Sequence, residues 1–125
     1  MKKVMVVDDD SMTRDLISYT LRKNGYEVIA VDDGLHAVIQ AQDEPPDLLI
    51  LDVMLPDLSG LEVLSLLRSR FRVNVPVIIM SRLDYQKVMI AADKLGAIQY
   101  LVKPFEMVDL IEKINAIPGF ESVAY

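Results

Sequence analysis

Short runs of apolar residues alternate along the chain with longer segments in which apolar residues recur every three or four positions. The short runs predict β-strands, and they cover residues 4–7, 28–31, 48–51, 75–80 and 98–102. Three of these runs consist almost entirely of Val, Ile and Leu, which is typical of strands that helices cover on both faces. The pattern therefore predicts a buried sheet.

The segments between and after these runs have the spacing of amphipathic helices. Helices are predicted around residues 12–21, 35–39, 61–67, 85–92 and 107–114. Gly25 and Gly96 follow two of them, at positions where helices commonly end. Five βα units in succession require right-handed crossovers. The predicted fold is α/β, a five-stranded parallel sheet that is doubly wound by five helices.

Polar residues with chemical capacity follow four of the five predicted strands. They are Asp8, Asp9 and Asp10 after strand 1, Asp52 after strand 3, Ser81 after strand 4 and Lys103 after strand 5. An acidic residue at a single strand end often caps the next helix, and residues 32–34 after strand 2 are interpreted as such a turn and cap. In a sheet of order 2-1-3-4-5, strands 1, 3, 4 and 5 are neighbours. Their polar residues then converge at the edge where ligands bind in such folds.

The chemistry of this predicted pocket is specific. Asp8, Asp9 and Asp52 bring three carboxylates close together, and such a cluster either raises a pKa or requires a cation. Oxygen ligands with room for water suit Mg²⁺. Lys103 adds an ammonium group suited to a phosphoryl oxygen, and Ser81 adds a hydroxyl donor. Together these groups indicate a site for phosphoryl transfer to a carboxylate.

Four stretches of the sequence resemble the receiver domain of bacterial response regulators. They comprise residues 6–10, 52–60, 78–81 and 96–105, and the resemblance extends from residue 3 to about residue 117. It implies a CheY-like, flavodoxin-like fold and a signalling switch of two-component systems. Such a switch is not an enzyme in the usual sense, because it catalyses only its own phosphorylation and dephosphorylation.

The resemblance also implies a role for each residue of the pocket. Asp52 would accept the phosphoryl group, and the Mg²⁺ cofactor would be bound by Asp52, by Asp9 directly, by Asp8 mainly through water, and by the backbone carbonyl of Met54. Lys103 would pair with the phosphoryl group.

A conformational switch is implied as well. Ser81 would hydrogen-bond the phosphoryl group, and Tyr100 would turn inward as Ser81 moves, which reshapes the surface of the fourth helix, fifth strand and fifth helix. Pro104 would follow a cis peptide bond, a form that proline makes accessible. The residues that tune hydrolysis of the phosphorylated form in this family correspond to Met54 and Leu83, which are both apolar.

Some positions depart from the family pattern. Arg82 replaces a small residue and could either cover the phosphoryl pocket or point to solvent. Gln99 replaces a common acidic residue, which weakens the expectation of a family-typical dimer face. His36 is the only histidine and is expected at the surface of the second helix.

Composition and length limit the organisation and the partners. The 125 residues suffice for one core, so we expect a receiver domain over residues 1–118 and a C-terminal tail or the start of a linker over residues 119–125. A complete single-domain regulator and the receiver of a longer protein both remain open. The absence of Cys excludes disulfides and thiolate metal sites, and the net charge of −6 argues against direct nucleic-acid binding. The first apolar run is too short for a signal or membrane segment, so a cytoplasmic protein without a membrane partner is expected.

The expected partners are a histidine kinase or phosphotransfer protein, or a small phosphodonor, and a downstream protein target or fused output domain. The sequence disfavours three alternatives. A phosphatase of the haloacid dehalogenase type requires a second Asp two positions after the nucleophile, where this chain has Met54. A nucleotide- or flavin-binding domain is disfavoured because no glycine-rich phosphate loop follows the first strand. A pseudo-receiver that only binds partners is disfavoured because every phosphorylation residue is present.

Overall fold

The computed structural model describes residues 2–82, 86–121, 123 and 124. Five parallel strands form one sheet in the order β2-β1-β3-β4-β5, as predicted. The strands are β1 Lys3–Val7, β2 Glu27–Val31, β3 Leu48–Asp52, β4 Val77–Ser81 and β5 Gln99–Val102. The predicted fold class is therefore confirmed.

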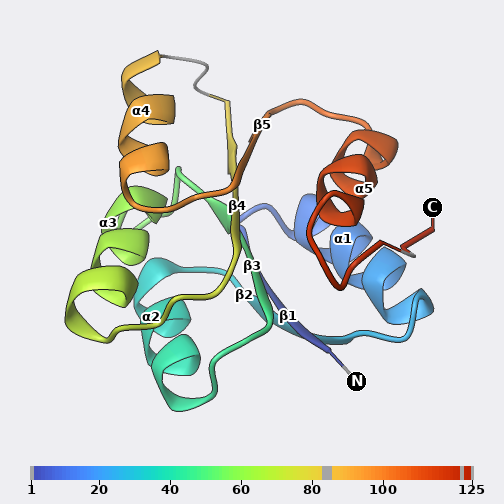
Figure 1. Cartoon of the computed structure of the whole chain (residues 1–125), viewed down its shortest axis with the longest axis horizontal. Helices are drawn as coiled ribbons and strands as arrows, with labels where there is room; N and C mark the ends of the chain where they lie inside the picture. Colours follow the sequence, from blue (N-terminus) through green and yellow to red (C-terminus); the bar gives the residue numbers. More distant parts are fainter. Residues whose placement is uncertain (1, 83–85, 122, 125) are drawn as a thin grey trace.

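The helices follow the strands in alternation. They are α1 Ser11–Lys23, α2 Gly34–Asp43, α3 Gly60–Ser65, α4 Gln86–Lys94 and α5 Met107–Asn115. Figure 1 shows α1 and α5 on one face of the sheet and α2, α3 and α4 on the other. The third helix continues as a π-helical turn, η1 Leu66–Arg70, which the apolar spacing did not predict. Tyr85, the predicted start of the fourth helix, lies outside the described residues.

The core has two halves because side chains alternate between the two faces of each strand. In β1, Val4 and Val6 pack on the side of α1 and α5, whereas Met5 and Val7 pack on the side of α2 and α3. All four side chains are fully buried. Burial on both faces explains why the strands read as unbroken apolar runs.

Local polar signals fix the helix ends. Asp33 caps α2, since its carboxylate accepts the His36 backbone N–H at 2.8 Å, which confirms the predicted turn and cap. Asp10 caps α1 in the same way through the Met12 N–H at 3.2 Å. Gly25 follows α1 with a φ of +86°, a left-handed conformation that favours glycine.

The chain packs back onto the domain after α5. Phe120 is buried and stacks on Tyr26 with ring centroids 5.6 Å apart. The Asn115 side chain exchanges hydrogen bonds with both the N–H and the carbonyl of Val123, each at 2.9 Å. These contacts extend the core on the α1 and α5 side. None of the helices in the described part of the chain is long and apolar enough to cross a membrane.

Candidate functional site

The candidate site lies at the carboxyl edge of the sheet. Asp8 directly follows β1, Asp52 is the last residue of β3, and Ser81 is the last residue of β4. Lys103 directly follows β5, and its backbone N–H donates to the Ser81 carbonyl at 2.7 Å. Because β1, β3, β4 and β5 are neighbours in the sheet, the strand ends bring these residues to one place.

Lys103 lies between two buried carboxylates. Its Nζ donates to Asp8 Oδ2 at 2.6 Å and to Asp52 Oδ2 at 3.1 Å. Asp8 is fully buried, and Asp52 is only 3% exposed. One carboxylate oxygen each of Asp8, Asp9 and Asp52 lies within 4.8 Å of the other two. The structure thus brings together three acidic groups and one ammonium group.

Asp8 is fixed by further hydrogen bonds. Its Oδ1 accepts the Asp10 N–H at 2.9 Å, and its carbonyl accepts Arg14 Nη1 at 2.7 Å. Because Oδ2 accepts the bond from Lys103, both carboxylate oxygens of Asp8 are hydrogen-bonded. The exposed Asp9 carboxylate is therefore the more accessible of the two. Arg14 was not identified in the sequence, because an arginine in the first turns of a helix gives no sign of the carbonyl that it will meet.

The ionisation of Asp52 reflects its surroundings. Burial and then the charge of Asp8 raise its pKa to about 6, against the opposing effect of Lys103. Burial by itself would lower the pKa of Lys103, but its hydrogen bonds and ion pairs with Asp8 and Asp52 outweigh burial and raise it. Lys103 is consequently protonated at neutral pH. Asp52 is mostly ionised there but is a stronger base than an ordinary aspartate.

A cavity of about 250 Å³ opens above Asp52, and its lining consists of Asp9, Asp10, Asp52, Met54, Arg82 and Lys103. Arg82 is exposed and borders this cavity, so this residue lies at the edge of the site. A second cavity of about 410 Å³ lies between α1 and the start of α5, and Asp10, Arg82 and Lys103 line it as well. The two cavities share a wall.

The acidic pocket fits a hard divalent cation. Three carboxylates face a single ammonium group there, so the pocket has an excess of negative charge when all groups are ionised. The side-chain ligands are oxygens, the cavity admits water, and the Asp9 carboxylate is exposed. These are the properties that Mg²⁺ requires of a protein site.

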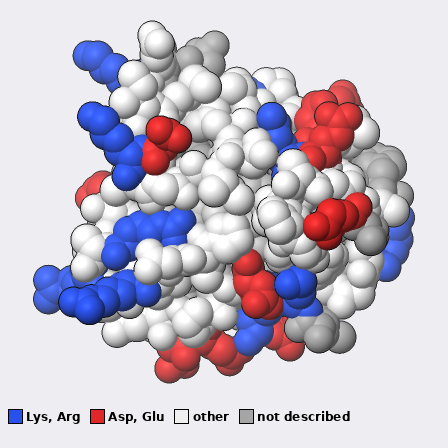
Figure 2. Space-filling view, in the orientation of Figure 1, with Lys and Arg blue, Asp and Glu red and all other residues white. Residues whose placement is uncertain are grey.

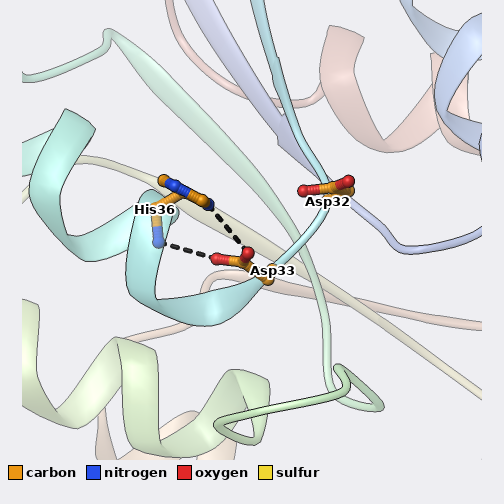
Figure 3. A group of neighbouring side chains, drawn as sticks. All are labelled: Asp32, Asp33 and His36. Atoms are coloured by element: carbon orange, nitrogen blue, oxygen red, sulfur yellow. Dashed lines mark hydrogen bonds and ion pairs between the residues drawn. The ribbon is translucent and has the colours of Figure 1, made fainter.

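A second group of possible ligands has a simpler explanation. Asp32, Asp33 and His36 also have oxygen and nitrogen atoms within 4.8 Å of one another. Figure 3 shows that Asp33 uses one oxygen to cap α2 and the other to contact the His36 ring nitrogen at 2.7 Å. The His36 side chain is 67% exposed, as expected for a surface residue. The start of the helix therefore accounts for the proximity of Asp33 and His36.

The remaining predicted residues lie around the pocket. Ser81 is fully buried at the end of β4, and Tyr100 is half-buried on β5, where it packs against the core on the α2 and α3 side. The peptide bond between Lys103 and Pro104 is cis. Leu83 lies outside the described residues.

Positive charge gathers elsewhere on the molecule. Figure 2 shows Lys and Arg side chains on the side where Figure 1 places α3 and α4, and Arg68, Arg70 and Lys94 lie in the last turns of η1 and α4. Arg68 donates to the carbonyls of Leu95 and Gly96 at 3.0 and 3.3 Å, so it joins η1 to the end of α4. Its role in the fold, like that of Arg14, was not evident from the sequence.

Comparisons with known proteins agree with this geometry. The response regulator receiver domain model matches residues 4–115. The chain is 38% identical over 116 residues to the alkaline phosphatase synthesis transcriptional regulatory protein PhoP of Bacillus subtilis, a match that covers 93% of this chain and 48% of the relative. This chain thus spans about half the length of that relative.

Solved structures give the same result. The receiver domain of the Francisella response regulator 1452 superposes with a TM-score of 0.85 at 34% identity, over 93% of this chain and 95% of that one. The Vibrio cholerae chemotaxis protein CheY4 superposes with a TM-score of 0.84 at 30% identity, over 94% of this chain and 98% of that one. These matches identify a signalling module, not a classical enzyme. The chain belongs to the response regulator receiver domain family of two-component systems.

Proposed function

We propose that this chain is a phosphorylation-activated switch in which Asp52 accepts a phosphoryl group in a Mg²⁺-dependent reaction. The observation that carries the proposal is the position of Lys103, whose ammonium group contacts both Asp8 and Asp52 within the acidic pocket. A buried lysine held between two carboxylates at a cavity is suited to neutralise the charge of a phosphoryl group that arrives there.

The residues of the pocket would have separate roles in the reaction. An oxygen of Asp52 forms a bond to phosphorus while the bond from phosphorus to the donor breaks, and the bonding electrons leave with the donor. Lys103 remains protonated and can follow the phosphoryl oxygens, since it is already within 3.1 Å of Asp52. A bound Mg²⁺ would neutralise phosphoryl charge, and Asp9, Asp52 and the Met54 carbonyl would bind it directly, with Asp8 acting through water.

The proposed output follows from the switch residues. Ser81 and Tyr100 lie on adjacent strands, which could transmit phosphorylation of Asp52 to the surface of α4, β5 and α5. The receiver unit would comprise residues 1–118, with residues 119–125 as a C-terminal tail or the start of a linker. The protein would act in the cytoplasm, where a histidine kinase, a phosphotransfer protein or a small phosphodonor would supply the phosphoryl group. The signal would pass to a protein target or to an output domain, without direct contact of this unit with nucleic acid or membrane.

The test of the phosphoacceptor is intact-mass analysis after incubation with Mg²⁺ and acetyl phosphate. We expect one added phosphoryl group in the wild type and in Asp33→Asn, which removes an acidic group outside the pocket, and none in Asp52→Asn or when Mg²⁺ is chelated. Rapid repeated release of phosphate would favour the phosphatase alternative. An unmodified wild type would favour the pseudo-receiver.

The test of the output is a comparison of backbone amide chemical shifts before and after addition of Mg²⁺ and beryllofluoride, a phosphoryl mimic. The switch is a biased two-state equilibrium, so we expect shift changes to reach α4, β5 and α5. Changes confined to the loops around Asp52 would rule out the switch role of Tyr100.

A further inference from the structure

The loop between β3 and α3, residues 53–59, carries Met54 and is fastened at its two ends. The Gly60 N–H donates to the Val53 carbonyl at 2.7 Å, and a Cβ at Gly60 would collide with the Asp52 carbonyl. The Met54 N–H donates to Asp52 Oδ1 at 3.2 Å. The middle of the loop has neither helix nor strand to order it, although Met54 depends on the loop for its position.

Asp57 attaches the middle of this loop to a different helix. Its Oδ1 accepts the Gly34 N–H at 2.8 Å, and its Oδ2 accepts the Leu35 N–H at 2.9 Å. These amides are the first two of α2, and their hydrogen bonds hold the pKa of Asp57 below its ordinary value. The positive end of a helix dipole strengthens such bonds to a carboxylate.

The loop and α2 also approach each other closely at Gly34. A Cβ at Gly34 would lie 2.9 Å from Leu58 Cβ and 3.0 Å from Val63 Cγ2. The absence of a side chain at Gly34 therefore allows the loop to reach the end of α2. Hydrogen bonding and close packing act on the same short segment of the loop.

We propose that Asp57 is a positioning residue that holds the β3–α3 loop on α2 and thereby presents the Met54 carbonyl to the cation. This inference rests on the proposed Mg²⁺-dependent function. A loop ordered in advance loses less conformational entropy when a ligand binds. Because coupling between two sites is reciprocal, Mg²⁺ binding also tightens the first turn of α2.

If Asp57 only stabilised the start of α2, any substitution that weakens this helix end would have the same effect on Mg²⁺ binding. Substitution of Asp33 therefore distinguishes a structural role from a positioning role. Asp33 caps the same end of α2 through the His36 N–H, yet its described hydrogen bonds stay within α2 (Figure 3). Asp33→Ala and Asp57→Ala should therefore both weaken the start of α2. Of the two, Asp57→Ala alone releases the loop.

The experiment titrates Mg²⁺ into metal-free protein by calorimetry for the wild type, Asp33→Ala, Asp57→Ala and Asp57→Asn. We expect a dissociation constant about fivefold higher in Asp57→Ala and a smaller increase in Asp57→Asn, which keeps one acceptor oxygen. The increase should be smallest in Asp33→Ala, which loosens the start of α2 but leaves the loop attached. Hydrogen exchange gives a second readout. Mg²⁺ should slow exchange of the Gly34 and Leu35 amides in the wild type and in Asp33→Ala, but not in Asp57→Ala.

Two results would overturn the positioning role of Asp57 while leaving the proposed function intact. Equal Mg²⁺ affinity in all folded variants, or an equal loss in Asp33→Ala and Asp57→Ala, would leave Asp57 with a structural role only. If Asp57→Ala does not fold, the comparison of Asp57→Asn with Asp33→Ala decides in the same way. A wild-type protein that binds no Mg²⁺ would instead overturn the proposed function, and this inference with it.

Discussion

Asp52→Asn is expected to stabilise the metal-free protein, although it destroys the proposed phosphoacceptor. The substitution keeps the shape of the side chain and removes its charge. Asp52 is 3% exposed and lies near Asp8, and these two features raise its pKa from the ordinary 3.8 to about 6. The charged form of Asp52 is thus less stable in the folded protein than in the unfolded chain, even with Lys103 beside it.

The size of the effect follows from the shift. A pKa raised by about two units corresponds to about 3 kcal/mol of destabilisation when Asp52 is ionised. This shift already includes the favourable interaction of the Asp52 carboxylate with Lys103, so losing that charge-assisted hydrogen bond adds no further cost. We therefore expect the free energy of unfolding to rise by about 3 kcal/mol in Asp52→Asn near neutral pH without metal.

The sign of the pH dependence provides a stricter test. Because the folded pKa is raised, the folded state binds a proton at Asp52 more tightly than the unfolded state does. The destabilisation is complete above about pH 6, decreases as the pH falls, and is lost below about pH 4. The advantage of Asp52→Asn over the wild type should shrink over the same range.

The assay is urea unfolding with a chelator present, followed by circular dichroism at several pH values. Glu112→Gln is the matched control, since it removes one exposed negative charge from α5 and should change stability by less than about 0.5 kcal/mol. An Asp52→Asn protein less stable than the wild type near neutral pH would refute the reasoning. So would an advantage that stays constant down to about pH 4.

Three further predictions concern the same pocket. Asp9→Ala should abolish Mg²⁺ binding in calorimetry and phosphorylation by acetyl phosphate. Its melting temperature without metal should be unchanged or higher, because the substitution relieves repulsion between carboxylates. A clearly lower melting temperature would contradict the clustering of the three carboxylates. Arg82→Ala should change the rate of phosphorylation by acetyl phosphate, either by opening the cavity that Arg82 borders or by removing attraction for the anionic donor, and equal rates would make Arg82 an ordinary surface residue. The wild type should lose its phosphoryl group more slowly than a Met54→Asn, Leu83→Glu double variant, because neither native side chain can orient a water by hydrogen bonding. Loss of the phosphoryl group from the wild type at an equal or higher rate would exclude this explanation.

The sequence by itself determined the elements, their order and the residues at the strand ends. Runs such as residues 48–51 are typical of strands covered on both faces, and the βα alternation permits few topologies. The sequence also predicted local features such as helix caps. The place of residues 32–34 after the second strand predicts a turn and cap, and the structure has that cap at Asp33. Such features depend on neighbours in sequence, so a single sequence contains them.

Tertiary structure decided how the strand-end residues meet. Lys103 contacts Asp8 and Asp52 across 95 and 51 residues of sequence, and the raised pKa of Asp52 depends on those distances and on burial. The bond from Arg14 to the Asp8 carbonyl and the attachment of Asp57 to α2 had no counterpart in any local pattern. Electrostatic and hydrogen-bond energies change steeply over less than an ångström, and only the packed chain sets side-chain positions that finely.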